Sequence, residues 1–135
     1  MAEVGIDRRD DPTIPDAEDL YRRVVDERIV TEQATGRKRL SSQAFSDRRN
    51  EISVDLSSMI SPEESLRLGL RCGGGPFRGI VAITAGQARD LDQAVLRDPI
   101  PDNPAHSLIC GKKSGQRRLA AQARWVYPPD QNPFV

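Results

Sequence analysis

Residues 52–57 read Ile-Ser-Val-Asp-Leu-Ser, and their regular alternation of apolar and polar side chains is the clearest structural signal in the chain. A period of two is typical of a β-strand that buries one face, so we predict a strand over these residues. Residues 79–84, Gly-Ile-Val-Ala-Ile-Thr, form a continuous apolar run of the kind found in a buried central strand. The two segments place a sheet at the centre of the fold.

Helices and further strands are predicted on both sides of these segments. A helix is expected over 16–29, because Asp16 can cap it and Leu20 and Val24 follow at helical spacing. Residues 61–64, Ser-Pro-Glu-Glu, are typical of a helix start, and that helix should end near Gly69. The other expected elements are a strand or extended loop over 40–46, a helix over 85–91, strands over 94–96 and 106–110, and a last helix from Ser114 that carries Leu119, Ala120, Ala123 and Val126 on one face.

This order of elements indicates an α/β protein, with α+β as the alternative. We expect a small mixed sheet of three to five strands, packed by an N-terminal helix, a C-terminal helix and short helices. A chain of 135 residues suits one domain. The predicted organisation is a flexible arm over 1–15, a single α/β domain over 16–127, and an extended, proline-rich tail over 128–135.

Composition narrows the class of protein. Hydrophobic residues make up 37% and charged residues 30%, which is typical of a soluble globular domain. The chain lacks an apolar run of the roughly 18 residues that cross a bilayer, and its start does not resemble a signal peptide. We therefore expect a cytoplasmic protein in which both cysteines, Cys72 and Cys110, are reduced thiols. The dominance of Arg, 17 of 20 basic residues, favours a GC-rich bacterial source.

Charge is distributed unevenly although the formal net charge is zero. Residues 1–35 carry ten acidic and five basic side chains, whereas residues 36–135 carry ten acidic and fifteen basic. The basic excess is strongest over 105–126, which contains no acid. The favoured interpretation is that the two ends attract each other or face water. The alternatives are a basic patch for phosphate or nucleic acid and a surface for a charged protein partner.

His106 is the only histidine, so a His-rich metal site is excluded and neither a metal nor a cofactor is expected. It follows a loop with three prolines, and a structural role in holding that loop is the favoured interpretation. The alternative is a catalytic His106 assisted by Asp102, Asn103 or Cys72. Cys110 lies four residues along the same strand, about 13 Å away, which is too far for a nucleophile–base pair.

Two glycine-containing segments are candidates for phosphate binding. The loop over 72–79 leaves a helix and opens a strand, the reverse of a dinucleotide-binding loop. Residues 111–114, Gly-Lys-Lys-Ser, follow a strand and open a helix, but their spacing does not match a P-loop. A weaker hypothesis remains, because helix N-termini attract anions. The residues of this predicted anion site are Lys112, Lys113, Ser114, Arg117 and Arg118.

The leading interpretation is a binding or accessory module that acts on a protein partner and is not an enzyme. It rests on the small fold, the charged ends and the lack of a recognisable catalytic set. The first alternative is a small enzyme with a site around His106 and the loop over 99–104. The second is an anion or nucleic-acid binder that uses the basic segment over 112–124. The clusters over 37–39 and 48–49 have no aromatic residues between them for base stacking, and Trp125 is interpreted as a core anchor.

Overall fold

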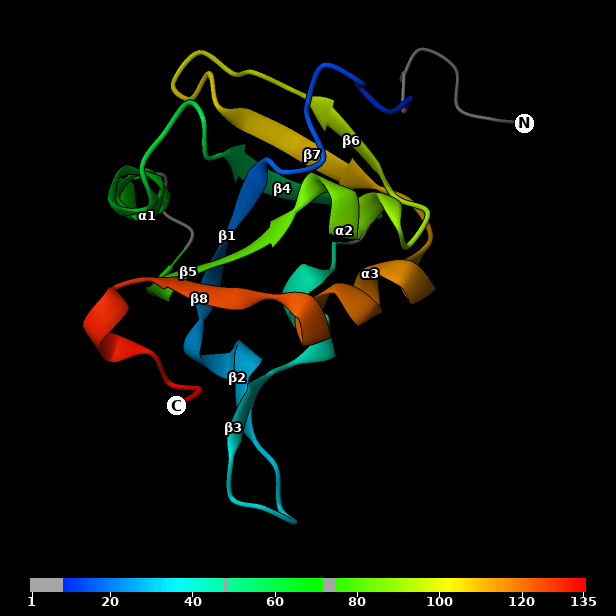
Figure 1. Cartoon of the computed structure of the whole chain (residues 1–135). Coiled ribbons are helices and arrows are strands. Elements are labelled where there is room, and N and C mark those ends of the chain that lie inside the picture. Colours follow the sequence, from blue (N-terminus) through cyan, green and yellow to red (C-terminus); the bar gives the residue numbers. More distant parts are fainter. Residues whose placement is uncertain (1–8, 48, 72–74) are drawn as a thin grey trace.

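A six-stranded antiparallel sheet forms the centre of the computed structural model, which describes residues 9–47, 49–71 and 75–135 (Figure 1). The strand order is β6-β7-β4-β1-β5-β8. The strands are β1 (Asp19–Val25), β4 (Glu51–Leu56), β5 (Phe77–Thr84), β6 (Ala94–Arg97), β7 (His106–Cys110) and β8 (Arg124–Tyr127). A separate hairpin pairs β2 (Ile29–Thr31) with β3 (Lys38–Leu40). The helices are α1 (Pro62–Arg71), α2 (Ala85–Arg89) and α3 (Lys113–Leu119), with short 3-10 turns at Asp26–Arg28 (η1), Ser42–Phe45 (η2), Ala120–Gln122 (η3) and Pro129–Gln131 (η4).

The two segments that indicated the sheet lie in its interior. β4 has the predicted alternation, with Ile52, Val54 and Leu56 buried in the main core, and the apolar run of β5 is buried on both faces. The main core lies on one face of the sheet, between the strands and α2, α3 and η2. Helix α1 packs on the other face, against β1 and β5. The two faces therefore have different surroundings, and each contains a cavity.

The predicted N-terminal helix over 16–29 is wrong, because β1 lies there. Leu20, Arg22 and Val24 point to one face with the period of a strand, and β1 pairs with both β4 and β5. The central residue of that face is Arg22, and its charge interrupts the alternation of apolar and polar residues that would indicate a strand. Its guanidinium donates hydrogen bonds to the carbonyl oxygens of Ala44 (3.0 Å) and Ser53 (2.9 Å), and burial lowers its pKa to about 10.

The sheet is larger than predicted and its six strands pair only in antiparallel fashion, so the expected mixed sheet of three to five strands is corrected. The C-terminal helix is shorter than predicted: α3 ends at Leu119, and 124–127 form the edge strand β8. Those residues include Trp125, Val126 and Tyr127, which are types that favour strands, and β5 offers them a partner. Helix α1, helix α2, β6 and β7 lie where the sequence predicts them.

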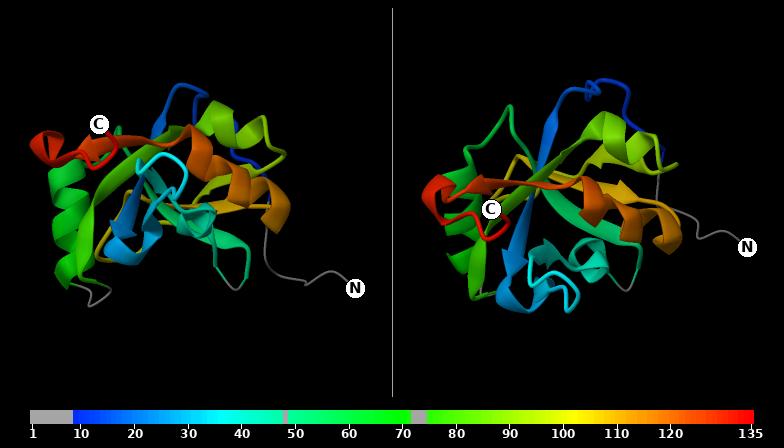
Figure 2. Two further views of the ribbon diagram at one scale, coloured as in Figure 1. Left: turned by 90° about the horizontal axis from the view of Figure 1, so that it is seen from below. Right: turned by 60° about the horizontal axis from the view of Figure 1, so that its bottom comes forward.

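Parts of the predicted arm and tail pack on the domain. In the segment 9–15, Ile14 is buried, the Asp11 amide donates to the Val95 carbonyl of β6, and Arg89 donates to Asp10 and to the carbonyl of Asp11. The C-terminal segment runs back beside the β2–β3 hairpin (Figures 1 and 2). No helix among the described residues has both the length and the apolar character to span a membrane.

Candidate functional sites

A cavity of about 540 Å³ lies between the β2–β3 hairpin, the α3–η3 segment, β8 and the C-terminal segment. We call it the basic pocket. It lies on the main-core face of the sheet, since Leu40 and Ala120 belong to that core and Trp125 packs against it. Its lining consists of Lys38, Arg39, Leu40, Ser42, Arg117, Ala120, Ala121, Ala123, Arg124, Trp125, Asn132 and Phe134.

Four cations and no carboxylate line the basic pocket, counting the residues that the structure describes. Two of the cations are in ion pairs at the rim: Arg124 with Asp19 (2.6 Å) and Arg39 with Glu32 (3.6 Å). Lys38 donates a hydrogen bond to the Thr31 hydroxyl, and this neutral group does not offset the positive charge of Lys38. Arg117 is exposed on α3. The potential at the pocket is therefore positive, which favours an anionic ligand.

Aromatic rings form part of the floor of the basic pocket. Trp125 and Phe134 meet edge to face, with ring centroids 6.0 Å apart and planes at 78°. The Trp125 Nε1 donates to the Pro128 carbonyl oxygen (2.6 Å), which fixes the orientation of the indole. A Cβ at Gly79 of β5 would collide with the indole ring, so this glycine makes room for it. The floor is thus an aromatic surface held by these contacts, and it lies beside exposed cationic side chains.

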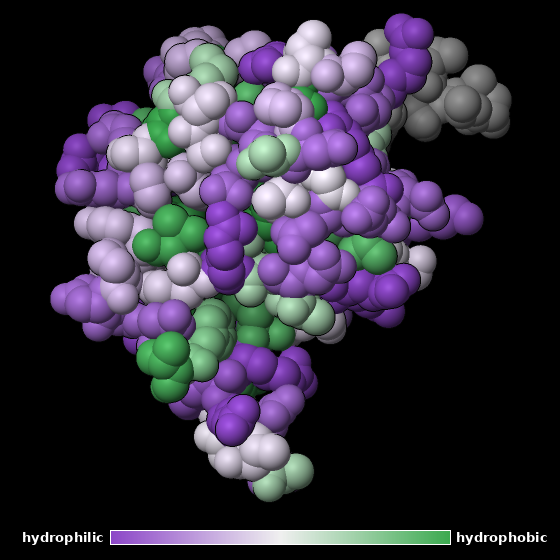
Figure 3. Space-filling view, in the orientation of Figure 1, coloured by the Kyte–Doolittle hydropathy of each residue, from purple (hydrophilic) through white to green (hydrophobic). Residues whose placement is uncertain are grey.

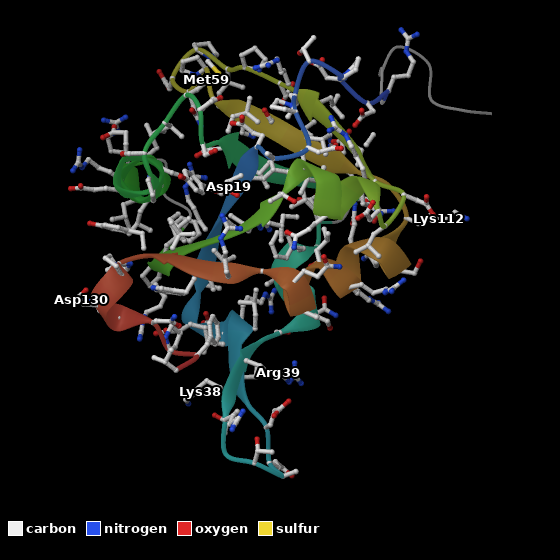
Figure 4. The ribbon with its side chains drawn as sticks, in the orientation of Figure 1. Asp19, Lys38, Arg39, Met59, Lys112 and Asp130 are labelled. Carbon is white, nitrogen blue, oxygen red and sulfur yellow. The ribbon has the colours of Figure 1, made fainter. Side chains whose placement is uncertain are left out.

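The basic pocket continues along the hairpin into a second cavity of about 480 Å³, with Lys38 and Phe134 lining both. Arg37 adds a further cation to this extension. Figure 3 shows hydrophobic surface between β8 and the hairpin, surrounded by hydrophilic surface, and Figure 4 shows Lys38 and Arg39 on the hairpin at the border of this region. Together the two cavities form a groove that extends along the hairpin beyond the basic pocket.

The predicted anion site is divided by the fold. Arg117 lines the basic pocket, whereas Arg118, its neighbour on α3, does not. Lys112, Lys113 and Ser114 lie exposed at the start of α3, outside the pocket lining. Sequence reasoning missed Lys38, Arg39, Trp125 and Phe134, because the two hairpin cations lie about 90 residues from the two rings in the chain.

The second candidate site surrounds His106 on the opposite face of the sheet. The ring Nδ1 lies 2.9 Å from the Asp98 carbonyl oxygen and 3.2 Å from the Asp98 Oδ2, and Nε2 lies 3.1 Å from the Ser53 Oγ. A carbonyl oxygen only accepts hydrogen bonds, so Nδ1 carries a proton. In the neutral ring Nε2 is then the acceptor, and the Ser53 hydroxyl donates to it.

Strand register brings Ser53 and His106 together. Residues Asp55 and His106 are paired across β4 and β7, as are Ser53 and Leu108, so the four side chains share one face. Three of them, Ser53, His106 and Leu108, line a cavity of about 490 Å³, which we call the histidine pocket. Its lining consists of Asp47, Arg49, Glu51, Ser53, Asp98, His106 and Leu108.

The loop before His106 is held by a buried carboxylate, Asp55, which is 1% exposed. Its oxygens accept hydrogen bonds from Asn103 Nδ2 (2.7 Å), Ser65 Oγ (2.6 Å) and Arg23 Nη2 (3.0 Å). These partners come from the proline-containing loop, α1 and β1. One carboxylate therefore connects three elements on the α1 face, and Asn103 is part of this network and not of the histidine pocket.

The other predicted partners of His106 have different positions. Asp102 is exposed in the loop, and Cys72 lies outside the described residues. Cys110 is buried at the far end of β7, as the spacing argument requires. Sequence reasoning missed Ser53 and Asp98 as partners; the outward position of Ser53 in the alternating strand is the only signal that pointed to it.

Comparison with known protein families, with curated proteins and with solved structures finds no match for this chain. Within 9–47, 49–71 and 75–135, no group of three or more His, Cys, Asp or Glu side chains could hold a metal ion. The fold and its two pockets therefore define a small mixed α/β protein with an antiparallel sheet, and any function has to be argued from the pockets themselves.

Proposed function

We propose that the protein binds single-stranded nucleic acid through the basic pocket. The observation that carries this proposal is the combination of four cations with a fixed aromatic floor in one cavity. Proteins that bind single strands join cationic side chains, which attract the phosphates, to aromatic rings, on which bases stack. In this pocket Trp125 supplies the stacking surface, and Lys38 and Arg117 supply charge for the phosphates.

The shape of the groove supports a single strand over a mononucleotide or a duplex. The extension lined by Arg37 and Lys38 continues the cationic surface beyond the volume that one nucleotide needs. A base in a duplex is stacked between its neighbours, and only an unstacked base can lie on the floor beside Trp125. Occupation of both cavities therefore requires a flexible chain of several nucleotides.

The predicted protein-binding module remains an alternative with less support. Such a module should present an exposed apolar patch or a bare sheet edge. Among the described residues, the exposed large apolar side chains come from four separate segments: Met59, Leu70, Ile100 and Val135. At β6 the edge is occupied, because the Val95 amide donates to the Asp10 carboxylate and its carbonyl accepts from the Asp11 amide.

Intrinsic fluorescence tests the proposal directly, because Trp125 is the only tryptophan of the chain. We expect a single-stranded oligonucleotide of twelve uridines to quench and shift Trp125 emission on binding. Uridine monophosphate at the same nucleotide concentration should bind far more weakly. If the monophosphate bound equally well, the ligand would be a small nucleotide and not a single strand. If neither probe changed the emission of Trp125, the proposal would be refuted.

Arg117→Glu and Arg118→Glu provide a matched pair of variants. Both change the net charge by two units on the same helix, but only Arg117 lines the pocket. We expect Arg117→Glu to weaken oligonucleotide binding by at least about tenfold, the equivalent of 1.4 kcal/mol, while Arg118→Glu has a much smaller effect. Equal losses of affinity in the two variants would show that binding depends on the net charge of the protein and not on the basic pocket. A poly-glutamate peptide that competes for the pocket would favour an acidic protein partner instead.

A further inference from the structure

We propose that the histidine pocket is a second, catalytic site, which hydrolyses carboxylic esters through Ser53 as the nucleophile and His106 as the general base. This proposal does not depend on nucleic-acid binding, since the two pockets lie on opposite faces of the sheet. It rests on three observations: the chain of hydrogen bonds from Asp98 through His106 to Ser53, the cavity onto which all three open, and the fixed backbone around them.

The direction of the hydrogen bonds is the one that activates a hydroxyl. The Asp98 carbonyl and carboxylate oxygens accept from Nδ1–H, which leaves the Nε2 lone pair aimed at the Ser53 hydroxyl, 3.1 Å away. A nucleophile, a base within hydrogen-bond reach and a third group that orients the base are the arrangement that nucleophilic catalysis requires. Asp98 is the positioning residue here, because it acts through the ring of His106.

Interactions around the three residues hold them in place. The Ser53 carbonyl accepts from the Arg22 guanidinium (2.9 Å), so the strand is anchored from the core side. On the loop side, Asn103 is held by Asp55 (2.7 Å), and the His106 amide donates to the Asn103 carbonyl (3.1 Å). Reacting groups held by a rigid sheet and a buried carboxylate need little reorganisation before reaction.

The reaction proceeds in two balanced steps. The Ser53 Oγ attacks the carbonyl carbon of the ester while its proton passes to His106 Nε2; the bond to the leaving alcohol oxygen then breaks, and His106 gives that oxygen the proton. This leaves an acyl group on Ser53. Water attacks the acyl carbon, again losing a proton to His106, and the Ser53 oxygen leaves and recovers that proton. The products are the alcohol and the carboxylic acid.

Charge in the pocket selects the class of ester. Three carboxylates line it, Asp47, Glu51 and Asp98, against one cation, Arg49, among the residues that the structure describes. An anionic substrate would be repelled, so the pocket suits neutral or cationic esters. Arg49 is the cation available to the negative charge that develops on the carbonyl oxygen during attack. This preference is opposite to that of the basic pocket.

A fluorophosphonate probe tests the proposal, because it forms a covalent bond only with a serine that a nearby base activates. We expect one label per chain, mapped by mass spectrometry to Ser53. Ser53→Ala should abolish labelling, while Ser58→Ala, which removes an exposed hydroxyl just beyond β4, should leave it unchanged. An unlabelled wild-type protein, or a label mapped elsewhere, would overturn the proposal without affecting nucleic-acid binding.

Two further variants separate catalysis from a purely structural histidine. His106→Gln should lower the labelling rate at Ser53 by about 100-fold, the low end of a general base's contribution. Asp98→Asn keeps the size and an acceptor oxygen, so the loop stays anchored, but it should still lower the labelling rate at least tenfold without changing the melting temperature. It should likewise lower kcat for p-nitrophenyl acetate with KM unchanged. A full labelling rate in His106→Gln would show that His106 only holds the loop.

Discussion

The two pockets differ in how their polar groups are held. In the basic pocket the cations extend from the surface of a hairpin, a short helix and an edge strand, and two of them, Arg39 and Arg124, form ion pairs with carboxylates outside the pocket lining. In the histidine pocket, Ser53 and His106 come from neighbouring strands, and each ring nitrogen of His106 has a defined partner. The basic pocket has exposed charges beside a ring held by its contacts, whereas the histidine pocket has a hydrogen-bonded chain from Asp98 through His106 to Ser53.

This difference suits the basic pocket to ligand binding and the histidine pocket to a covalent reaction. Exposed ion pairs contribute little to stability and rearrange readily, which suits a flexible polyanion that has to be accommodated along a groove. A covalent step requires the reacting atoms to be held close to their final geometry. The contrast therefore predicts that the pockets can be damaged independently.

The largest expected effect is that of Asp55→Ala, which should damage the histidine pocket. The substitution leaves Arg23, Ser65 and Asn103 without their buried acceptor, and we expect a loss of about 3 kcal/mol or more in the free energy of unfolding. Urea unfolding measures this loss, and Glu63→Ala, at an exposed ion pair of α1, is the control with a loss within about 0.5 kcal/mol. If the network were unimportant, both variants would unfold at the same urea concentration.

Asn103→Ala is a milder form of the same perturbation, because it detaches only the loop from Asp55. We expect Ser53 labelling to fall several-fold while Trp125 emission and oligonucleotide binding stay at the wild-type level. A parallel loss of both activities would show that the two pockets are coupled, and the comparison between them would fail.

Gly79→Ala should have the converse effect and damage the basic pocket. The added methyl group collides with the Trp125 indole, and such overpacking costs about 1–3 kcal/mol. We expect shifted Trp125 emission and weaker oligonucleotide binding, with fluorophosphonate labelling of Ser53 retained. Unchanged emission would contradict the tight contact between the indole and β5.

A smaller effect is expected in the salt dependence of binding. Removal of one phosphate contact from a single-strand complex changes the slope of log K against log salt by about 0.7. Lys38→Ala should reduce the slope by that amount, and Lys113→Ala, which removes an exposed lysine outside the pocket lining, should leave it unchanged. An equal change in Lys113→Ala would show that the phosphates extend beyond the pocket to the start of α3, where the sequence predicted an anion site.

The smallest effect concerns the packed part of the predicted arm and should reach neither pocket. Hydrogen bonds from the Thr13 hydroxyl and amide lower the pKa of Asp11 from its model-compound value of 3.8. The ionised Asp11 carboxylate therefore contributes its full stabilisation of the folded state above pH 3.8. This contribution is lost as the pH falls through the lower pKa that Asp11 has in the folded protein. Hydrogen exchange of the Asp11 amide should show reduced protection at that acidic pH. Asp11→Asn should abolish this pH dependence, and its persistence would assign the change to another carboxylate.

Much of the sheet could be predicted from local pattern, whereas the sites could not. The alternation of β4, the apolar run of β5 and the Ser-Pro-Glu-Glu start of α1 are each explained by neighbouring residues alone. The failure at β1 has a definite cause, since a partly buried arginine in the middle of the inward face breaks the apolar pattern that indicates a strand. The C-terminal strand likewise exists because β5 provides an edge for it to pair with.

The sequence by itself determined the class of the protein: its size, its central strands, its basic C-terminal half and a single histidine that follows a proline-containing loop. Only the tertiary structure decided which side chains meet. The fold places the hairpin cations around rings from the C-terminal segment, and strand register sets Ser53 beside His106. The physical reason is that secondary structure follows from periodicities within a few residues, while both pockets depend on contacts between segments whose proximity is set by packing of the whole sheet.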